Sequence, residues 1–221
     1  MALSLMPPPE FRGNYALRGS YRCAPSTGAV TVIAAKTATA GHIFSMRNED
    51  SAIRIFVKRV AARFILNTAY TTPQETGCGL WIARSYTASH GGGTAIDAGT
   101  TITHSGKLMT ALTTSALDTA GLVRVASTTA LTGSSYTLDA QPLATLSAWT
   151  PGLGDTVPLV TSAYGGGYGV LFDADTSAHK VPIVLAQDEG IVIANTILMG
   201  AVGVGRWDFL VEWDEGTPIS P

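Results

Sequence analysis

The chain has 221 residues, of which only 14% are charged, and its formal net charge is −2. This length holds one large domain or one domain with appendages, and two cysteines, Cys23 and Cys78, exclude a disulfide framework. No apolar run is long enough to predict a membrane-spanning helix, and the first nine residues lack the pattern of a secretory signal.

Charge is distributed unevenly along the chain. Residues 1–63 contain nine Lys and Arg against three Asp and Glu, whereas residues 151–221 contain two against nine. Such asymmetry steers partners or sister subunits in some proteins and belongs to solvated faces in others. The low charge content also has two readings: partners or further copies cover much of the surface, which we favour, or Thr and Ser replace charge on an ordinary domain. Nucleic-acid binding is not expected, because basic and aromatic residues occur together only within residues 1–22.

Residues 1–28 are predicted to form an extended N-terminal arm, and residues 29–221 a single β-sandwich domain. The run MPPPEF favours an extended polyproline conformation. Aromatic and arginine side chains, the types that anchor interfaces, follow it: Phe11, Arg12, Tyr15, Arg18, Tyr21 and Arg22. Such an arm would lie across a neighbouring subunit. The alternative is that this segment is an ordinary first strand of the same domain.

Short strands separated by Gly, Pro and polar turn residues are expected along the rest of the chain. The expected strands are residues 29–35, 42–46, 79–87, 122–126, 156–160, 170–172 and 181–186. Within 79–87, alternation places Tyr86 on the face of Leu80 and Ile82. Residues 101–114 are either a strand or a link.

Residues 53–66 fit two structures. A helix would place apolar side chains on one stripe and basic ones opposite. A strand requires the apolar positions to change phase, which implies a β-bulge near Lys58 and Arg59. We favour the strand, because the other periodic segments are β and β-branched residues lead this one.

The most regular stretch is residues 190–215, GIVIANTILMGAVGVGRWDFLVEWDE. It predicts two strands joined by a glycine-rich turn. In the second strand the large apolar side chains share one face and are expected to enter the core: Trp207, Phe209, Val211 and Trp213. The overall pattern predicts an all-β fold, an antiparallel, jelly-roll-like β-sandwich.

No set of residues has the spacing of a metal site or a catalytic motif. The four histidines stand alone in sequence: His42, His90, His104 and His179. Asp173 and Asp175 would point the same way on an extended segment, and could then hold a cation or cleave a glycan. We expect neither, and predict a protein that is not an enzyme and has no catalytic residues, metal or cofactor.

Two segments resemble small virion structural proteins of tailed bacteriophages. EGIVIANT, the glycine-spaced turn and RWDFLVEWDE resemble their C-terminal hairpin, and TTALTGSSYTLDAQPLATLSAW is similar to a mid-chain segment. The resemblance covers less than half of the chain. It implies a β-sandwich that coats or bridges a capsid or tail, and it carries over no active-site residue.

The favoured function is a capsid decoration or cement subunit, which binds and stabilises a bacteriophage shell. It would be located on the virion, after assembly in the host cytoplasm. Its partners would be the major capsid protein or other virion proteins and further copies of itself, a trimer being one closed assembly, with no membrane partner. The alternative is a tail-associated receptor- or glycan-binding module, in which Tyr164 and Tyr168 stack on sugar rings. A glycan hydrolase would rest on Asp173 and Asp175 alone.

Overall fold

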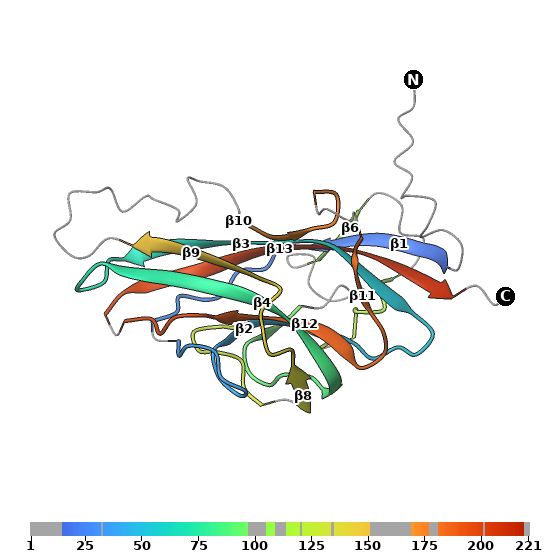
Figure 1. The fold of residues 1–221 in the computed structure, drawn as a ribbon, viewed down its shortest axis with the longest axis horizontal. Helices are drawn as coiled ribbons and strands as arrows, with labels where there is room; N and C mark the ends of the chain where they lie inside the picture. The colour runs from blue at the N-terminus through green and yellow to red at the C-terminus, as the bar shows by residue number, and fades with distance from the viewer. Residues whose placement is uncertain are drawn as a thin grey trace, which may run out of the picture.

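The fold is two antiparallel β-sheets packed as two layers. A computed structural model describes residues 15–31, 33–96, 105–108, 114–119, 121–133, 135–150, 169–176, 181–200 and 202–218, with only the backbone described for 105–108 and Ala148. Figure 1 shows β1, β3 and β13 in one layer and β2 and β12 in the other. Within the described ranges all regular structure is β, which confirms the predicted all-β class. These ranges contain no helix long and apolar enough to cross a membrane. Jelly-roll connectivity stays a prediction.

The first sheet, sheet A, has the strand order β10–β3–β13–β1–β6, and β11 pairs with a further part of β3. Its strands are β1 Tyr15–Cys23, β3 Arg54–Thr68, β6 Ser105–Leu108, β10 Gly169–Asp173, β11 Ile183–Leu185 and β13 Val204–Pro218. The two long strands β3 and β13 pair over almost their whole length, so they form the centre of this sheet.

The second sheet, sheet B, has the order β5–β7–β2–β12–β4–β8, and β9 also pairs with β4. Its strands are β2 His42–Asn48, β4 Gln74–Ala88, β5 Thr94–Ala95, β7 Val123–Val125, β8 Ser135–Leu138, β9 Ala144–Thr150 and β12 Glu189–Asn195. Strand β4 is long enough for β9 to pair with its first half and β8 with its second.

Strand β3 confirms both the strand and the bulge predicted for residues 53–66. Ile55 and Val57 are buried before the bulge, and Val60 and Phe64 after it, so the buried positions change from odd to even. The register with β13 shifts opposite Lys58, which is the extra residue. The bulge lets one strand keep its apolar side chains on the core face along its full length.

The inner face of β13 lies in the core between the sheets. The Trp207, Phe209 and Val211 side chains are fully buried, and Trp213 is nearly so. Trp207 packs on Phe64 with ring centroids 5.0 Å apart, while Phe209 reaches across to Phe44 of sheet B at 5.5 Å. Because β13 is central in its sheet, these side chains contact both layers.

The predicted C-terminal hairpin is wrong. Strand β12 lies in sheet B between β2 and β4, whereas β13 lies in sheet A between β3 and β1. The glycine-rich connection therefore crosses from one layer to the other. Gly203 packs directly against a buried ring, since a Cβ atom there would lie 2.1 Å from Cδ1 of Tyr70. The glycines thus allow close packing at the crossing rather than a two-stranded turn.

Two further expectations are corrected. The described residues of 29–35 form no strand, and Val30 makes an isolated bridge to Gly205. Residues 15–23 of the predicted arm are paired with β13 as β1 and belong to the sandwich. Residues 1–14, 156–160 and 162–168 lie outside the described residues.

Candidate functional site

The described part of the predicted arm is bound to its own sandwich. Tyr21 is buried and stacks on Trp213 at 5.9 Å between ring centroids, and Tyr15 packs edge-on against Phe56 at 5.2 Å. The half-buried Arg18 faces a buried carboxylate on β13, and only Arg22 is exposed. Three of these four side chains are therefore occupied within the chain and are not displayed to a partner. Phe11 and Arg12 lie outside the described residues.

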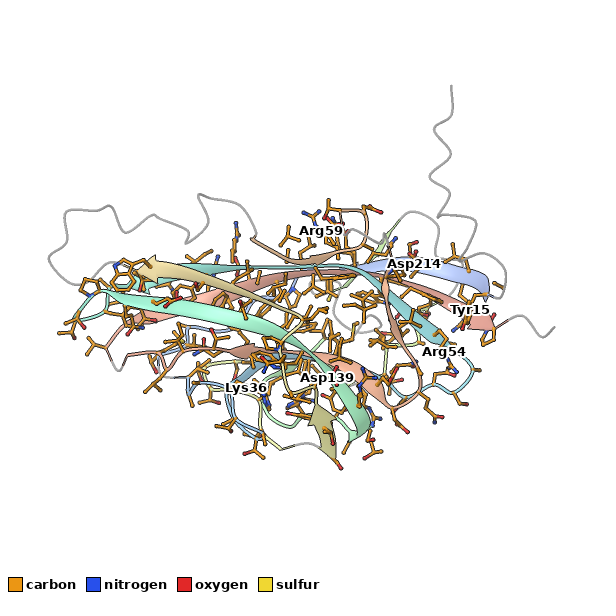
Figure 2. All side chains as sticks on the ribbon, in the orientation of Figure 1. Tyr15, Lys36, Arg54, Arg59, Asp139 and Asp214 are labelled. Carbon is orange, nitrogen blue, oxygen red and sulfur yellow. The ribbon has the colours of Figure 1, made fainter. Side chains whose placement is uncertain are left out.

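Oppositely charged side chains pair across β3 and β13 on the outer face of sheet A. Lys58 Nζ lies 2.7 Å from Asp214 Oδ1, and Arg63 Nε lies 2.8 Å from Asp208 Oδ2. Arg206 Nε lies 3.2 Å from the other oxygen of Asp208. Figure 2 shows Arg59 and Asp214 on this side of the molecule, away from Lys36 and Asp139. The basic N-terminal and acidic C-terminal parts of the sequence thus meet within one sheet.

A fully buried carboxylate, that of Glu215, fastens the segment 114–119 to β13. It accepts hydrogen bonds from the Ser115 hydroxyl, from the Ala116 N–H at 2.9 Å and from Trp213 Nε1–H at 3.2 Å. Arg18 Nη1 lies 3.9 Å away. Because several donors surround the carboxylate and solvent does not reach it, it stabilises the fold rather than serving as an accessible acid or base.

Asp173 and Asp175 do not form a carboxylate pair. The chain turns over residues 174–176, directly after β10, so the extended segment that would align them is absent. Asp173 Oδ1 accepts the N–H of Asp175 at 2.9 Å, and its other oxygen lies 3.9 Å from Arg59 Nε. A polar turn, rather than a cation site or a hydrolase pair, is the role that these contacts support.

Two histidines and two tyrosines form a buried polar cluster on the outer face of sheet B, which we call the His–Tyr network. Tyr86 Oη lies 2.5 Å from His90 Nδ1, and His90 Nε2 lies 3.0 Å from His42 Nδ1. Tyr136 Oη lies 2.8 Å from His42 Nδ1 and 3.2 Å from His90 Nε2. His42 and His90, which stand alone in sequence, are therefore neighbours in the fold.

The local backbone explains how Tyr86 reaches this network. Ser85 has a φ of 52°, a left-handed conformation that is uncommon outside glycine. It changes the alternation of β4, so Tyr86 packs with Ala83 and Val192 instead of sharing the face of Leu80. The prediction for Tyr86 is wrong for this reason, since strict alternation assumes an unbroken strand.

Burial keeps the network uncharged near neutral pH. His42 and His90 are only 1% and 3% exposed. Burial lowers the pKa of His42, and the charge of Lys36 lowers it further. The hydrogen bond with the Thr37 carbonyl opposes both effects and raises the pKa. The pKa of His90 is lowered to about 3, mainly by burial and further by the nearby His42 and Arg124. Burial also raises the pKa of Tyr86 to about 12, so that its hydroxyl keeps its proton.

Large apolar side chains are exposed on or beside edge strands of both sheets. Strands β10 and β11 form an edge of sheet A, β9 forms one of sheet B, and β9 contacts β10. Trp149 of β9 is 70% exposed. The exposed set at or beside these strands, which we call the apolar edge, is Leu143, Trp149, Val170, Val181 and Val184.

Other reactive groups are few in the described part of the chain. Cys23 and Cys78 are buried and unpaired, and burial raises the pKa of both thiols, which disfavours the reactive thiolate. Nowhere in the described ranges do three His, Cys, Asp or Glu side chains gather as a metal-binding group. No protein-family model, curated protein or solved structure matches this chain, so arguments about its function rest on its own residues.

Proposed function

We propose that the protein is a non-enzymatic structural protein of a bacteriophage virion, a decoration or cement subunit that binds and stabilises the capsid shell. The observation that carries this proposal is the apolar edge. Trp149, 70% exposed on β9, is the largest exposed apolar side chain in the described ranges, and large aromatic side chains commonly anchor protein interfaces. The assignment to a virion rests on the resemblance of two sequence segments to phage structural proteins.

The state of the polar groups supports binding rather than catalysis. On sheet A, Asp208 and Asp214 of β13 pair with basic residues of β3, and Glu215 accepts hydrogen bonds from backbone and side-chain donors. On sheet B, the His–Tyr network is covered by protein. An exposed surface dominated by Trp149 and aliphatic side chains suits a protein partner that covers it.

Occupancy on particles tests the proposal. Purified full chain is mixed with shells that lack it, and bound protein is quantified and located by cryo-electron microscopy. Trp149→Ser should lower occupancy at least tenfold, because large buried aromatics dominate interface energies. The matched control is Leu17→Ser, which removes an apolar side chain that is 65% exposed on β1, away from the apolar edge. Absence of wild-type protein from particles refutes the proposal, and loss of binding only with Leu17→Ser moves the interface to β1.

Trp149 also supports the alternative, a tail-associated glycan-binding module. Thr145 and Ser147 are exposed at the same strand parity as Trp149, and Glu75 pairs with Trp149 on β4. An aromatic ring beside hydroxyl and carboxylate groups is suited to stacking and hydrogen bonding with a sugar. A glycan array separates the two functions: binding that disappears with Trp149→Ser favours the module, and no binding by the wild type favours the shell protein.

A further inference from the structure

The most exposed aromatic side chain in the described ranges lies directly opposite an exposed carboxylate. Trp149 of β9 pairs in register with Glu75 of β4, the neighbouring strand in Figure 1, so both side chains stand on the same face of sheet B. Within the described part of the chain neither side chain has an ion pair, a hydrogen bond or a ring partner. We propose that the Trp149–Glu75 pair binds an arginine side chain of a protein partner.

The chemistry of the pair fits a guanidinium group. A cation above an aromatic ring is attracted by the negative face of the ring, and Trp is the strongest such ring. The planar guanidinium stacks on an aromatic side chain and can also donate two parallel hydrogen bonds to a carboxylate. Residues directly opposite each other on paired strands have Cβ atoms about 5 Å apart, so one guanidinium can contact both side chains.

The charges near the pair leave room for a cation from outside. The segments that surround it are residues 67–79, 144–150 and 196–200, and Glu75 is their only charged residue. The nearest basic strand cannot supply the cation, because Lys58 and Arg63 of β3 are already paired with carboxylates of β13. The site is therefore locally negative, which favours a basic group of the partner over an acidic one.

An apolar side chain lies on the other side of β4. The Thr196 N–H donates to a carbonyl of β4 at 2.9 Å, and the Gly200 N–H donates to Gln74 Oε1 at 3.1 Å. Leu198 lies midway between these two bonds, so it is level with Glu75 and on the side of β4 away from β9. It is 60% exposed, and the methylene groups of an arginine side chain pack well on such a surface.

The inference rests on the proposed function, since it names the chemistry that the partner presents to Trp149. The test titrates the isotope-labelled full chain with acetyl-arginine amide at constant ionic strength and follows nuclear magnetic resonance signals. The Trp149 indole N–H and the Glu75 backbone N–H should shift saturably. Acetyl-citrulline amide, which has a similar shape without the charge, should bind at least threefold more weakly.

Variants of the pair test each contact separately. Glu75→Gln and Trp149→Ser should each weaken binding of acetyl-arginine amide by roughly two- to fivefold, because each removes one of two contacts with the cation. The Glu75 backbone N–H reports binding in the Trp149→Ser variant. The matched control is Asp175→Asn, which removes an exposed carboxylate on the turn after β10 and should leave the affinity unchanged.

Three results overturn the site: no saturable shift with acetyl-arginine amide, equal affinity for acetyl-citrulline amide, or equal binding by the wild type and both variants. The comparison of the two amides uses the wild type, so it does not depend on the folding of a variant. Occupancy on shells separates this inference from the proposed function. If Trp149→Ser lowers occupancy and Glu75→Gln does not, the arginine contact fails and the shell function stands. If the amide binds but the chain is absent from particles, the site stands and the shell function fails.

Discussion

Acidification should destabilise the protein through the His–Tyr network. Burial, His42 and Arg124 lower the pKa of His90 to about 3, against an ordinary value of 6.5. Between these values the unfolded chain binds a proton that the folded chain does not, so the free energy of unfolding rises with pH. The stabilisation from neutral His90 is therefore complete above about pH 6.5 and is lost as the pH falls towards 3.

The size of this loss in the free energy of unfolding follows from the pKa of histidine in the unfolded chain. At pH 5, about 1.5 units below that value, His90 costs about 2 kcal/mol, at about 1.4 kcal/mol per unit. The pKa of His42 is lowered in the same direction, so it adds a loss of the same sign. Tyr86, which faces His90, does not titrate in this range, because its pKa is raised to about 12. A loss of about 2 kcal/mol from His90 alone is large against a typical total stability of about 5–15 kcal/mol.

Urea denaturation at pH 8 and pH 5, with a chelator present, measures this effect. The wild-type midpoint should fall clearly on acidification, whereas His90→Gln should lose about 2 kcal/mol less over the same interval. Carboxylates elsewhere affect both proteins equally, so the difference between them reports His90 together with its interaction with His42. Equal losses in the wild type and the variant would refute the reasoning.

Three further perturbations test the fold. Trp207→Ala should cost about 3–5 kcal/mol in urea denaturation, because it leaves a cavity at a fully buried position. Glu215→Gln should cost about 1–3 kcal/mol by the same measurement, since the buried donors around it lose a charged acceptor. Deleting residues 1–22 should unfold the sandwich by circular dichroism, because Tyr21 and the pairing of β1 with β13 are lost. Deleting residues 1–14 retains β1 and should leave the spectrum unchanged.

The sequence predicts a strand well where apolar and polar residues alternate regularly. The phase change at Lys58 is visible in the sequence because Ile55 and Val57 alternate on one parity and Val60 and Phe64 on the other. A strand that keeps one face buried must then contain an extra residue, so the bulge follows from the pattern alone.

Long-range pairing was not predictable in the same way. Residues 29–35 have the apolar content of a strand, yet among those that the structure describes only Val30 finds a bridging partner. Glycines 200, 203 and 205 indicate a change of direction, but they do not tell whether the chain returns to the same sheet or crosses to the other. His42 and His90 are 48 residues apart, and Tyr86 reaches them past Ser85, whose φ of 52° no period encodes.

The uneven charge distribution of the sequence is consistent with contact between sister subunits, but ion pairs between β3 and β13 account for it within one chain. Lys58 and Arg63 on β3 neutralise Asp214 and Asp208 on β13 within the same chain. The asymmetry therefore reflects the distance in sequence between two paired strands, and it gives no reason to expect a second subunit. A partner, whether a shell protein or another copy, would gain most by covering Trp149 of β9, the largest exposed apolar side chain in the described ranges. We therefore expect the binding surface at Trp149 rather than on residues 15–22, whose strand is part of the sandwich itself.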